Sequence, residues 1–250
     1  MSNELVRRLA DAERVAVLTG AGVSAESGVP TFRDEEGLWE RFSPKELAHV
    51  DAFLDNPELV QGWYAHRRKI VTETEPNPAH RALADLEALV PEFLLITQNV
   101  DDLHRQAGNE AVVELHGNLR RSYCIDCGRN ASEEDLAPNR EGAVAECPDC
   151  GGLLRPDVVW FGERLPEGAV ERAQEAAARA DVFLSVGTSA VVFPAAGLPR
   201  IAAGRGAYTA EVNPERSAVA DELDEVLQGK AGEVLPPLVE SAREEAEAQT

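Results

Sequence analysis

Lysine is scarce in this 250-residue chain, where Lys45, Lys69 and Lys230 are its only lysines. The chain has 24 Lys+Arg against 45 Asp+Glu, which gives a formal net charge of −21. Proteins that bind nucleic acid or anionic membranes need a cationic face, so we expect neither partner. Many carboxylates with few lysines are expected of a protein that stays hydrated at high salt, hence a halophilic one; an ordinary acidic cytoplasmic protein is the alternative.

Long apolar runs are also missing. No segment approaches the roughly 20 apolar residues of a membrane span. Residues 1–8 lack the apolar stretch of a signal peptide, so we expect a cytoplasmic protein. Hydrophobic residues still make up 44% of the chain, which argues against disorder and allows an ample core.

Cysteine is the third scarce residue, with only Cys124, Cys127, Cys147 and Cys150. Two C-x2-C pairs separated by 19 residues are typical of a tetrahedral structural zinc site. All four thiols would be ligands, so this site has no open catalytic position. Two disulfides or a redox pair are the alternatives, and a cytoplasmic location disfavours stable disulfides.

Short apolar runs alternate with helical patterns along most of the chain. The runs, predicted as strands, are residues 15–18, 93–96, 112–115, 158–161, 182–186 and 208–212. The predicted helices are residues 4–13, 80–90, 168–180, 195–203 and 232–249. This alternation predicts an α/β fold with a parallel sheet and crossover helices on both faces. Residues 35–70 and 120–153 break the alternation, and we expect them to form a smaller lobe.

A glycine-rich turn follows the first predicted strand. Gly20, Gly22 and Ala25 fit the G-x-G-x-x-G/A pattern, whose small residues let the backbone approach a pyrophosphate. A tight turn without a ligand is the alternative. The acidic residue expected at the end of a second strand is missing, because residues 35–40 are not strand-like. An ordinary dehydrogenase is therefore disfavoured.

Polar residues gather at the carboxyl ends of the predicted strands, where open α/β sheets bind ligands. They are Gln98, Asn99, Asp101, His116, Gly187, Thr188, Ser189 and Asn213. A neutral imidazole at His116 could act as a general base near pH 7. A structural histidine that hydrogen-bonds a loop is the alternative.

These motifs together resemble the sirtuins, the NAD-dependent protein deacylases. The resemblance rests on residues 20–33 and 97–104, His116-Gly117, the paired cysteines, residues 187–189 and Asn213, in this order. It covers nearly the whole chain. It implies a Rossmann-like parallel-sheet domain with a smaller lobe made of a zinc ribbon and a helical module, and substrates in the cleft between them.

The resemblance also implies domain limits. The NAD-binding Rossmann-like domain would comprise residues 1–34, 82–119 and 154–250. The helical module would comprise residues 35–81, and the zinc ribbon residues 120–153.

Site roles follow from the resemblance position by position. The residues implied to bind NAD are Gly20, Ala21, Gly22, Ser24, Phe32, Arg33, Gln98, Asn99, Asp101, Gly187, Thr188, Ser189, Asn213 and Ala231. Asn99, Asp101 and His116 would be catalytic, with His116 as the base that takes a proton from the ribose hydroxyls. NAD would be a consumed cosubstrate, one zinc ion would be structural, and the products would be lysine, nicotinamide and O-acyl-ADP-ribose.

The expected partners are acylated-lysine proteins or peptides. Val158, Trp160, Phe161 and Gly162 resemble the segment that holds the peptide, which can add to a backbone edge. An ordinary core strand is the alternative there.

Acyl preference is implied by a second pair of residues. Tyr64 and Arg67 are spaced i and i+3 on one helix face, where an arginine and a phenol can bind a carboxylate. This pair resembles the Tyr-x-x-Arg of the desuccinylase and demalonylase branch. Arg68 lies about 100° further around the helix and should point elsewhere.

Three alternatives remain for the function. A deacetylase-only sirtuin would lack the acid-binding pocket. A mono-ADP-ribosyltransferase would use the same ribose chemistry on another nucleophile. A non-catalytic zinc-ribbon binding protein is disfavoured by the charge of −21 and by the complete set of cofactor residues.

Overall fold

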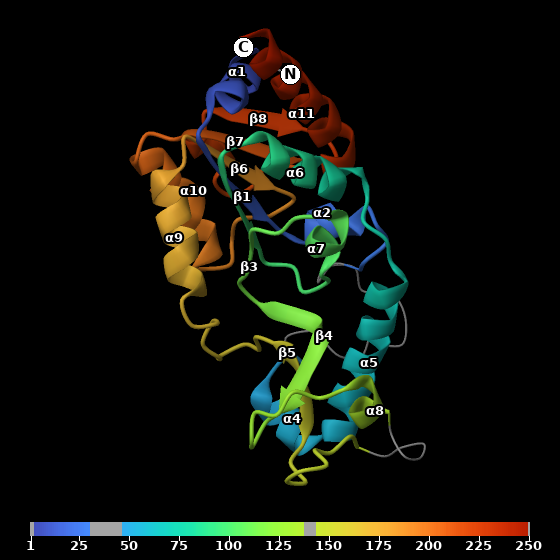
Figure 1. Ribbon diagram of the computed structural model, residues 1–250. Coiled ribbons are helices and arrows are strands. Elements are labelled where there is room, and N and C mark those ends of the chain that lie inside the picture. The colour runs from blue at the N-terminus through green and yellow to red at the C-terminus, as the bar shows by residue number, and fades with distance from the viewer. Residues whose placement is uncertain (1–2, 31–46, 138–143, 250) are drawn as a thin grey trace.

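A computed structural model describes residues 3–30, 47–137 and 144–249 of the chain. Figure 1 shows a larger sheet domain with helices on both sides and, below it, a smaller lobe; both termini lie at the far end of the larger domain. The predicted cofactor residues Phe32 and Arg33 fall outside the described residues.

The central sheet has six parallel strands in the order β3-β2-β1-β6-β7-β8. They are β1 (Arg14–Thr19), β2 (Glu92–Thr97), β3 (Val112–Glu114), β6 (Val182–Val186), β7 (Tyr208–Asn213) and β8 (Glu225–Gln228). β1 pairs with both β2 and β6, and Thr19 stands opposite Thr97 and Val186. The carboxyl ends of three strands therefore lie side by side. The predicted parallel sheet is confirmed.

Helices cover both faces of this sheet, as predicted (Figure 1). On one face lie α1 (Asn3–Asp11), α6 (Pro78–Leu89) and α11 (Ala231–Ala248); on the other lie α9 (Ala169–Arg179) and α10 (Leu198–Gly204), which follows the 3-10 turn η1 (Ala195–Gly197). Ala169, Ala173 and Ala177 recur every four residues on α9 and are buried. Side chains this small let the helix axis approach the sheet closely.

The smaller lobe contains α4 (Val50–Asp55), α5 (Pro57–Glu73), α8 (Glu133–Leu136) and an antiparallel pair, β4 (Gly117–Cys124) and β5 (Leu154–Val158). Its main core includes Phe53, Trp63 and Trp160. The other short elements are α2 (Ala21–Ala25), α7 (Leu103–Ala107) and η2 (Ala220–Glu222).

The predicted strand over residues 158–161 is wrong. The strand is β5, which ends at Val158 and pairs with β4 outside the parallel sheet. Beyond it, the Val159 amide donates to the carbonyl of His116 at 2.9 Å, and the Phe161 amide donates to Ala48 at 2.9 Å. Gly162 then turns the chain with φ of +86°. The apolar run is a connecting segment that bonds to His116 after β3 and to Ala48 in the smaller lobe.

Three predicted domain limits fall inside structural units, and the limit between residues 119 and 120 divides β4. The limit between residues 81 and 82 divides α6, whose Ala79 and Ala82 pack in the same core. Residue 154 was expected to return to the larger domain, but it begins β5, which pairs with β4. The division into domains stays a proposal.

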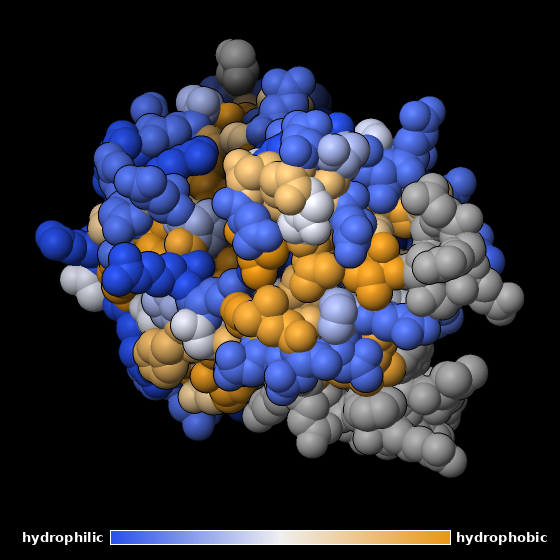
Figure 2. Space-filling model, turned by 90° about the horizontal axis from the view of Figure 1, so that it is seen from below, coloured by the Kyte–Doolittle hydropathy of each residue, from blue (hydrophilic) through white to orange (hydrophobic). Residues whose placement is uncertain are grey.

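The surface of the smaller lobe carries both hydrophobic and hydrophilic residues. Figure 2 looks from below Figure 1, and hydrophobic residues gather near the middle of this face within a hydrophilic surround. Along the described ranges, no helix combines the length and apolar character that a membrane crossing requires.

Candidate NAD and acyl-lysine site

The polar residues predicted at the strand ends meet at one edge of the sheet. The Gln98 side-chain amide donates to the Thr188 hydroxyl at 3.0 Å, so the loops after β2 and β6 are joined. The Asn213 amide donates to the Thr188 carbonyl at 3.0 Å, which adds the end of β7. Ser189 continues this loop, and its carbonyl accepts from Ala218. Residues from three strands thus form the edge where a parallel sheet binds its ligands.

Glycines are required here by close packing between two loops. A Cβ at Gly20 would lie 2.7 Å from the Thr188 Cβ, and one at Gly22 would lie 2.8 Å from the Gly187 carbonyl oxygen. Gly187 itself has φ of +59°, a conformation that favours glycine. The Gly22 amide donates to that same carbonyl at 2.9 Å. Both loops therefore present backbone to the site, and Ala21 begins α2 between the two glycines.

Asn99, Ser24 and Asp101 form one hydrogen-bonded group. The Asn99 amide donates to the Gly20 carbonyl at 3.1 Å and to the Ser24 hydroxyl at 3.0 Å. Ser24 in turn hydrogen-bonds the Asp101 carboxylate. Both amide hydrogens of Asn99 are used, so its carbonyl oxygen is the group left to meet a ligand. Burial raises the pKa of Asp101, which is also held by the Leu103 amide at 3.0 Å.

His116 follows β3 with one ring nitrogen committed. Its Nδ1 lies 3.0 Å from the Gln98 carbonyl oxygen, which can only accept, so Nδ1 carries the hydrogen. Burial lowers the pKa of His116 below the ordinary imidazole value and favours the neutral ring. Nε2 then holds a lone pair, which is the state a general base needs.

The other histidines near the sheet have structural roles. His80 and Asn77 form the capping box of α6, and His104 Nε2 lies 3.0 Å from the Thr19 hydroxyl. Burial lowers the pKa of His80 to about 4 and lowers that of His104 as well. The Thr19 hydroxyl donates to Thr97 at 2.9 Å, a buried link between β1 and β2 that sequence reasoning missed.

Tyr64 and Arg67 lie on α5 in the smaller lobe. Tyr64 is 5% exposed, and its hydroxyl accepts from the Trp160 indole at 2.8 Å. Arg67 places its guanidinium 4.9 Å from the Trp63 ring centroid, and its charge acts on both Tyr64 and Asp101. Tyr64 and Arg67 therefore lie near Asp101, which is predicted to bind NAD. Arg68 points elsewhere, as predicted: it donates to the Leu119 carbonyl at 3.0 Å and to Ser122 at 2.9 Å.

The predicted peptide segment has two kinds of residue. Val158 and Trp160 are buried in the lobe core, whereas Phe161 is exposed. The amides of residues 159–161 all donate within the chain. A second exposed apolar segment, Val191–Phe193, directly follows the predicted cofactor loop after β6, and Phe193 is 70% exposed. Sequence reasoning missed it, although three bulky apolar residues before a proline were a usable signal.

Ala231 opens α11 and is buried. The amide of the next residue, Gly232, donates to the Glu26 carboxylate at 3.1 Å. Glu26 follows α2, so this bond ties the start of α11 to the glycine-rich turn.

The four cysteines converge at the end of the smaller lobe. Their sulfur atoms all lie within 4.8 Å of one another, with pairs at 3.5 and 3.7 Å. A tetrahedral zinc with Zn–S bonds of roughly 2.3 Å needs sulfurs roughly 3.8 Å apart, so the cluster fits this ion. A Cβ at Gly152 would lie 2.9 Å from the Cys124 sulfur, which explains that glycine. All four are free thiols, not disulfides.

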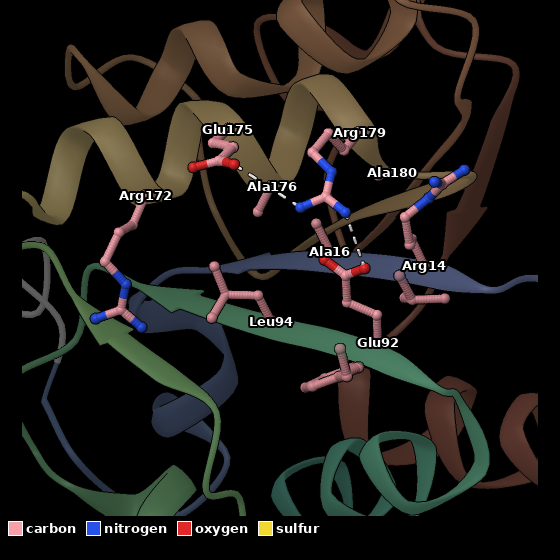
Figure 3. Close-up of a pocket in the computed structure, with 11 residues that line it drawn as sticks. Arg14, Ala16, Glu92, Leu94, Arg172, Glu175, Ala176, Arg179 and Ala180 are labelled. Carbon is pink, nitrogen blue, oxygen red and sulfur yellow. Dashed lines mark hydrogen bonds and ion pairs between the residues drawn. The ribbon is translucent and has the colours of Figure 1, made fainter.

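A separate cavity of about 210 Å³ lies at the opposite, amino ends of β1 and β2, beneath α9 (Figure 3). Several of its charged side chains are paired: Arg179 lies 3.1 Å from Glu92 and 3.8 Å from Glu175. Arg14 pairs with Asp181 at 2.8 Å. Parallel sheets bind ligands at their carboxyl ends, so this cavity is not the cofactor site.

The chain is similar to known proteins of one family. The Sir2 family model matches residues 20–194. A Pyrobaculum aerophilum protein named NAD-dependent protein deacylase 2 is 52% identical over 235 residues, 94% of this chain and 93% of that protein. NAD-dependent protein deacylase 1 of Archaeoglobus fulgidus is 49% identical over 243 residues, 97% of this chain and 98% of that protein.

Two solved structures extend the comparison. A Sir2 homolog–NAD complex superposes with a TM-score of 0.92 at 47% identity and covers 98% of this chain and 95% of its own. A Sir2–p53 peptide–NAD⁺ structure has a TM-score of 0.85 at 33% identity and covers 96% of this chain and 98% of its own.

The fold and the edge of the sheet define an NAD-dependent enzyme with a Rossmann-like domain and a cysteine cluster that fits structural zinc. The chain belongs to the Sir2 family, the sirtuins, and is an NAD-dependent protein deacylase.

Proposed function

We propose that this deacylase removes succinyl and malonyl groups from lysine side chains, and acetyl groups as well. The observation that carries the acyl preference is the buried Tyr64 hydroxyl beside the Arg67 guanidinium. Burial raises the pKa of Tyr64, so the phenol keeps its proton and can donate it. A guanidinium and a phenol together offer a carboxylate charged hydrogen bonds, which an acetyl group does not use.

The residues at the sheet edge supply the remaining chemistry in this proposal. NAD, when bound, offers an electrophilic ribose carbon to the acyl oxygen and ends as nicotinamide and O-acyl-ADP-ribose. The loops at Gly20–Gly22 and Gly187–Ser189 would hold the cofactor, with Asn213 and Ala231 at its adenosine half. Gln98 would contact the nicotinamide ribose.

Three side chains would act on the reacting end. The Asn99 carbonyl oxygen and the Asp101 carboxylate would orient the nicotinamide half, because their other bonds fix both groups. His116 would accept a ribose hydroxyl proton at Nε2, since Nδ1 is held by the Gln98 carbonyl. The zinc ion would keep the ribbon folded and take no part in the reaction.

The acylated peptide would pass between the two segments that present apolar side chains near the edge. These are Phe161 with Gly162, and Val191–Phe193. Because the amides of residues 159–161 are already bonded, peptide contacts on that side fall to exposed side chains and carbonyl groups. Such contacts demand little of the peptide sequence.

Matched acetyl, malonyl and succinyl peptides test the acyl preference. We expect Tyr64→Phe and Arg67→Met to lower kcat/KM for succinyl peptide by roughly tenfold to a hundredfold, and to lower deacetylation far less. Lys69→Met removes a cation from the exposed side of the same helix and is the matched control. Equal losses on both substrates would show that the acid-binding pocket does not exist.

Mass spectrometry of the same reactions separates the alternative activities. Release of O-acyl-ADP-ribose supports the deacylase, whereas a mass gain on the protein substrate indicates ADP-ribosyl transfer.

A further inference from the structure

The Tyr64 hydroxyl has a fixed hydrogen-bond direction. The indole Nε1 of Trp160 lies 2.8 Å from the Tyr64 oxygen, and the two ring centroids are 6.1 Å apart. An indole N–H can only donate, so the tyrosine must accept in this bond. Both side chains are buried, with Trp160 1% exposed.

This bond decides where the Tyr64 proton points. A phenol hydrogen lies near the plane of its ring and has two favoured positions. The Trp160 N–H approaches the oxygen from one side, so the hydrogen must take the other. The Arg67 guanidinium is near enough for its positive charge to act on Tyr64. The proton is therefore directed away from the indole and can be donated to an anion that binds at Arg67.

The indole is itself held from several directions. The Arg155 guanidinium carbon lies 3.6 Å from the Trp160 ring centroid, and the Phe53 ring lies 5.1 Å away. Arg155 is buried and binds Glu163 through two contacts of 2.6 and 2.8 Å. Glu163 also accepts from the Trp160 backbone amide at 2.8 Å. An ion pair between a buried arginine and a partly exposed glutamate therefore sets the position of the indole N–H.

We propose that Trp160 is a positioning residue for acyl selectivity, whose indole N–H orients the Tyr64 hydroxyl so that it donates to the carboxylate of a succinyl or malonyl group. The inference rests on the proposed function of the Tyr64–Arg67 pair. It gives Trp160 a role through Tyr64, in place of the direct peptide contact expected from the sequence.

Trp160→Phe removes the N–H and keeps an aromatic ring. We expect the ratio of succinyl to acetyl kcat/KM to fall about threefold to tenfold, mainly through the KM of the succinyl peptide. Unequal effects on the two acyl groups are not expected from a general loosening of the core. A ratio that stays at the wild-type value, with both activities falling together, would overturn the positioning role.

A double-mutant cycle gives the sharper test. If Trp160 acts through the Tyr64 hydroxyl, Trp160→Phe should leave the succinyl-to-acetyl ratio unchanged when Tyr64→Phe is already present. Additive effects in the double variant would contradict the proposal. Should Trp160→Phe fail to fold, replacement of Trp160 by 3-benzothienylalanine keeps the ring shape and removes only the N–H. The same fall in the ratio is expected of it.

The outcomes distinguish this inference from the function on which it rests. If Tyr64→Phe and Arg67→Met do not change the acyl ratio, the proposed pocket fails and the role of Trp160 fails with it. If those variants change the ratio and the Trp160 variants do not, only the positioning role is overturned.

Discussion

The carboxyl edge of the sheet and the zinc ribbon (residues 120–137 and 144–153) are organised by different forces. At the sheet edge, glycines bring two loops into backbone contact, and buried amides and hydroxyls are hydrogen-bonded between strands. The small core of the ribbon contains Cys124, Ala145 and Cys147 and is completed by Leu154 of β5, so half of its buried members are thiols. The edge is therefore built by the fold of the large domain, whereas we expect the ribbon to depend on a zinc ion.

Metal removal should give the largest effect and test this contrast directly. Structural zinc supplies about 10–16 kcal/mol of binding free energy in small domains, more than so small a core can replace. We expect a chelator to abolish hydrogen-exchange protection in the ribbon while β1, β2 and β6 keep theirs. Adding zinc back should restore the protection. Unchanged protection in a protein shown by metal analysis to be metal-free would contradict the contrast.

His116→Gln should affect the chemistry at the sheet edge without changing the fold of the sheet domain or of the zinc ribbon. We expect kcat to fall about 10²–10⁴-fold, because the base is lost, while NAD affinity measured by calorimetry is nearly unchanged. Equal losses of kcat and NAD affinity would indicate a structural role.

The pH dependence of the wild-type enzyme follows from the same residue. Burial lowers the pKa of His116, so the neutral base persists below the ordinary imidazole pKa. The acid limb of the kcat/KM profile should therefore have its midpoint below 6.5, with activity lost as pH falls through it.

Two glycine substitutions, one in each region, should have smaller effects, and each should affect only its own region. The Cβ of Gly22→Ala would meet the backbone at Gly187, so we expect a loss of about 1–3 kcal/mol in unfolding free energy and weaker NAD binding. Gly152→Ala would crowd Cys124 and Asp126, and should weaken zinc retention while sparing NAD binding.

Gly62→Ala is the control, because its Cβ meets nothing within 4 Å on α5. It should be neutral or stabilising by up to about 1 kcal/mol. Calorimetry, NAD titration and metal analysis measure all three variants. Loss of zinc in Gly22→Ala, or of NAD binding in Gly152→Ala, would show that the regions are coupled.

Much of the candidate site could be predicted because short sequence motifs indicate its residues. The strand ends, the glycine turn, the cysteine spacing and His116 each rest on residues close together in the chain. Parallel strands bring their carboxyl ends together, so the gathering of Gln98, Thr188 and Asn213 followed from the fold class. The edge strand β8 was missed because Glu225–Gln228 is short and partly exposed, with no buried apolar run.

Other features depended on contacts between distant segments. Residues 158–161 have the composition of a buried strand, but Val159 and Phe161 bond to His116 and Ala48 outside the parallel sheet. Burial of an apolar segment does not require ladder pairing, so composition alone could not separate the two cases.

The sequence by itself determined the parallel sheet, the family and the cluster of four cysteines, because periodicity, spacing and small residues encode them locally. Only the tertiary structure decided how the residues of the proposed acyl pocket are arranged. Tyr64 and Trp160 are 96 residues apart, and their hydrogen bond exists because α5 packs against the segment after β5. The direction of that hydrogen bond depends on how the two side chains pack, so it could not be predicted from the sequence around Tyr64 or around Trp160.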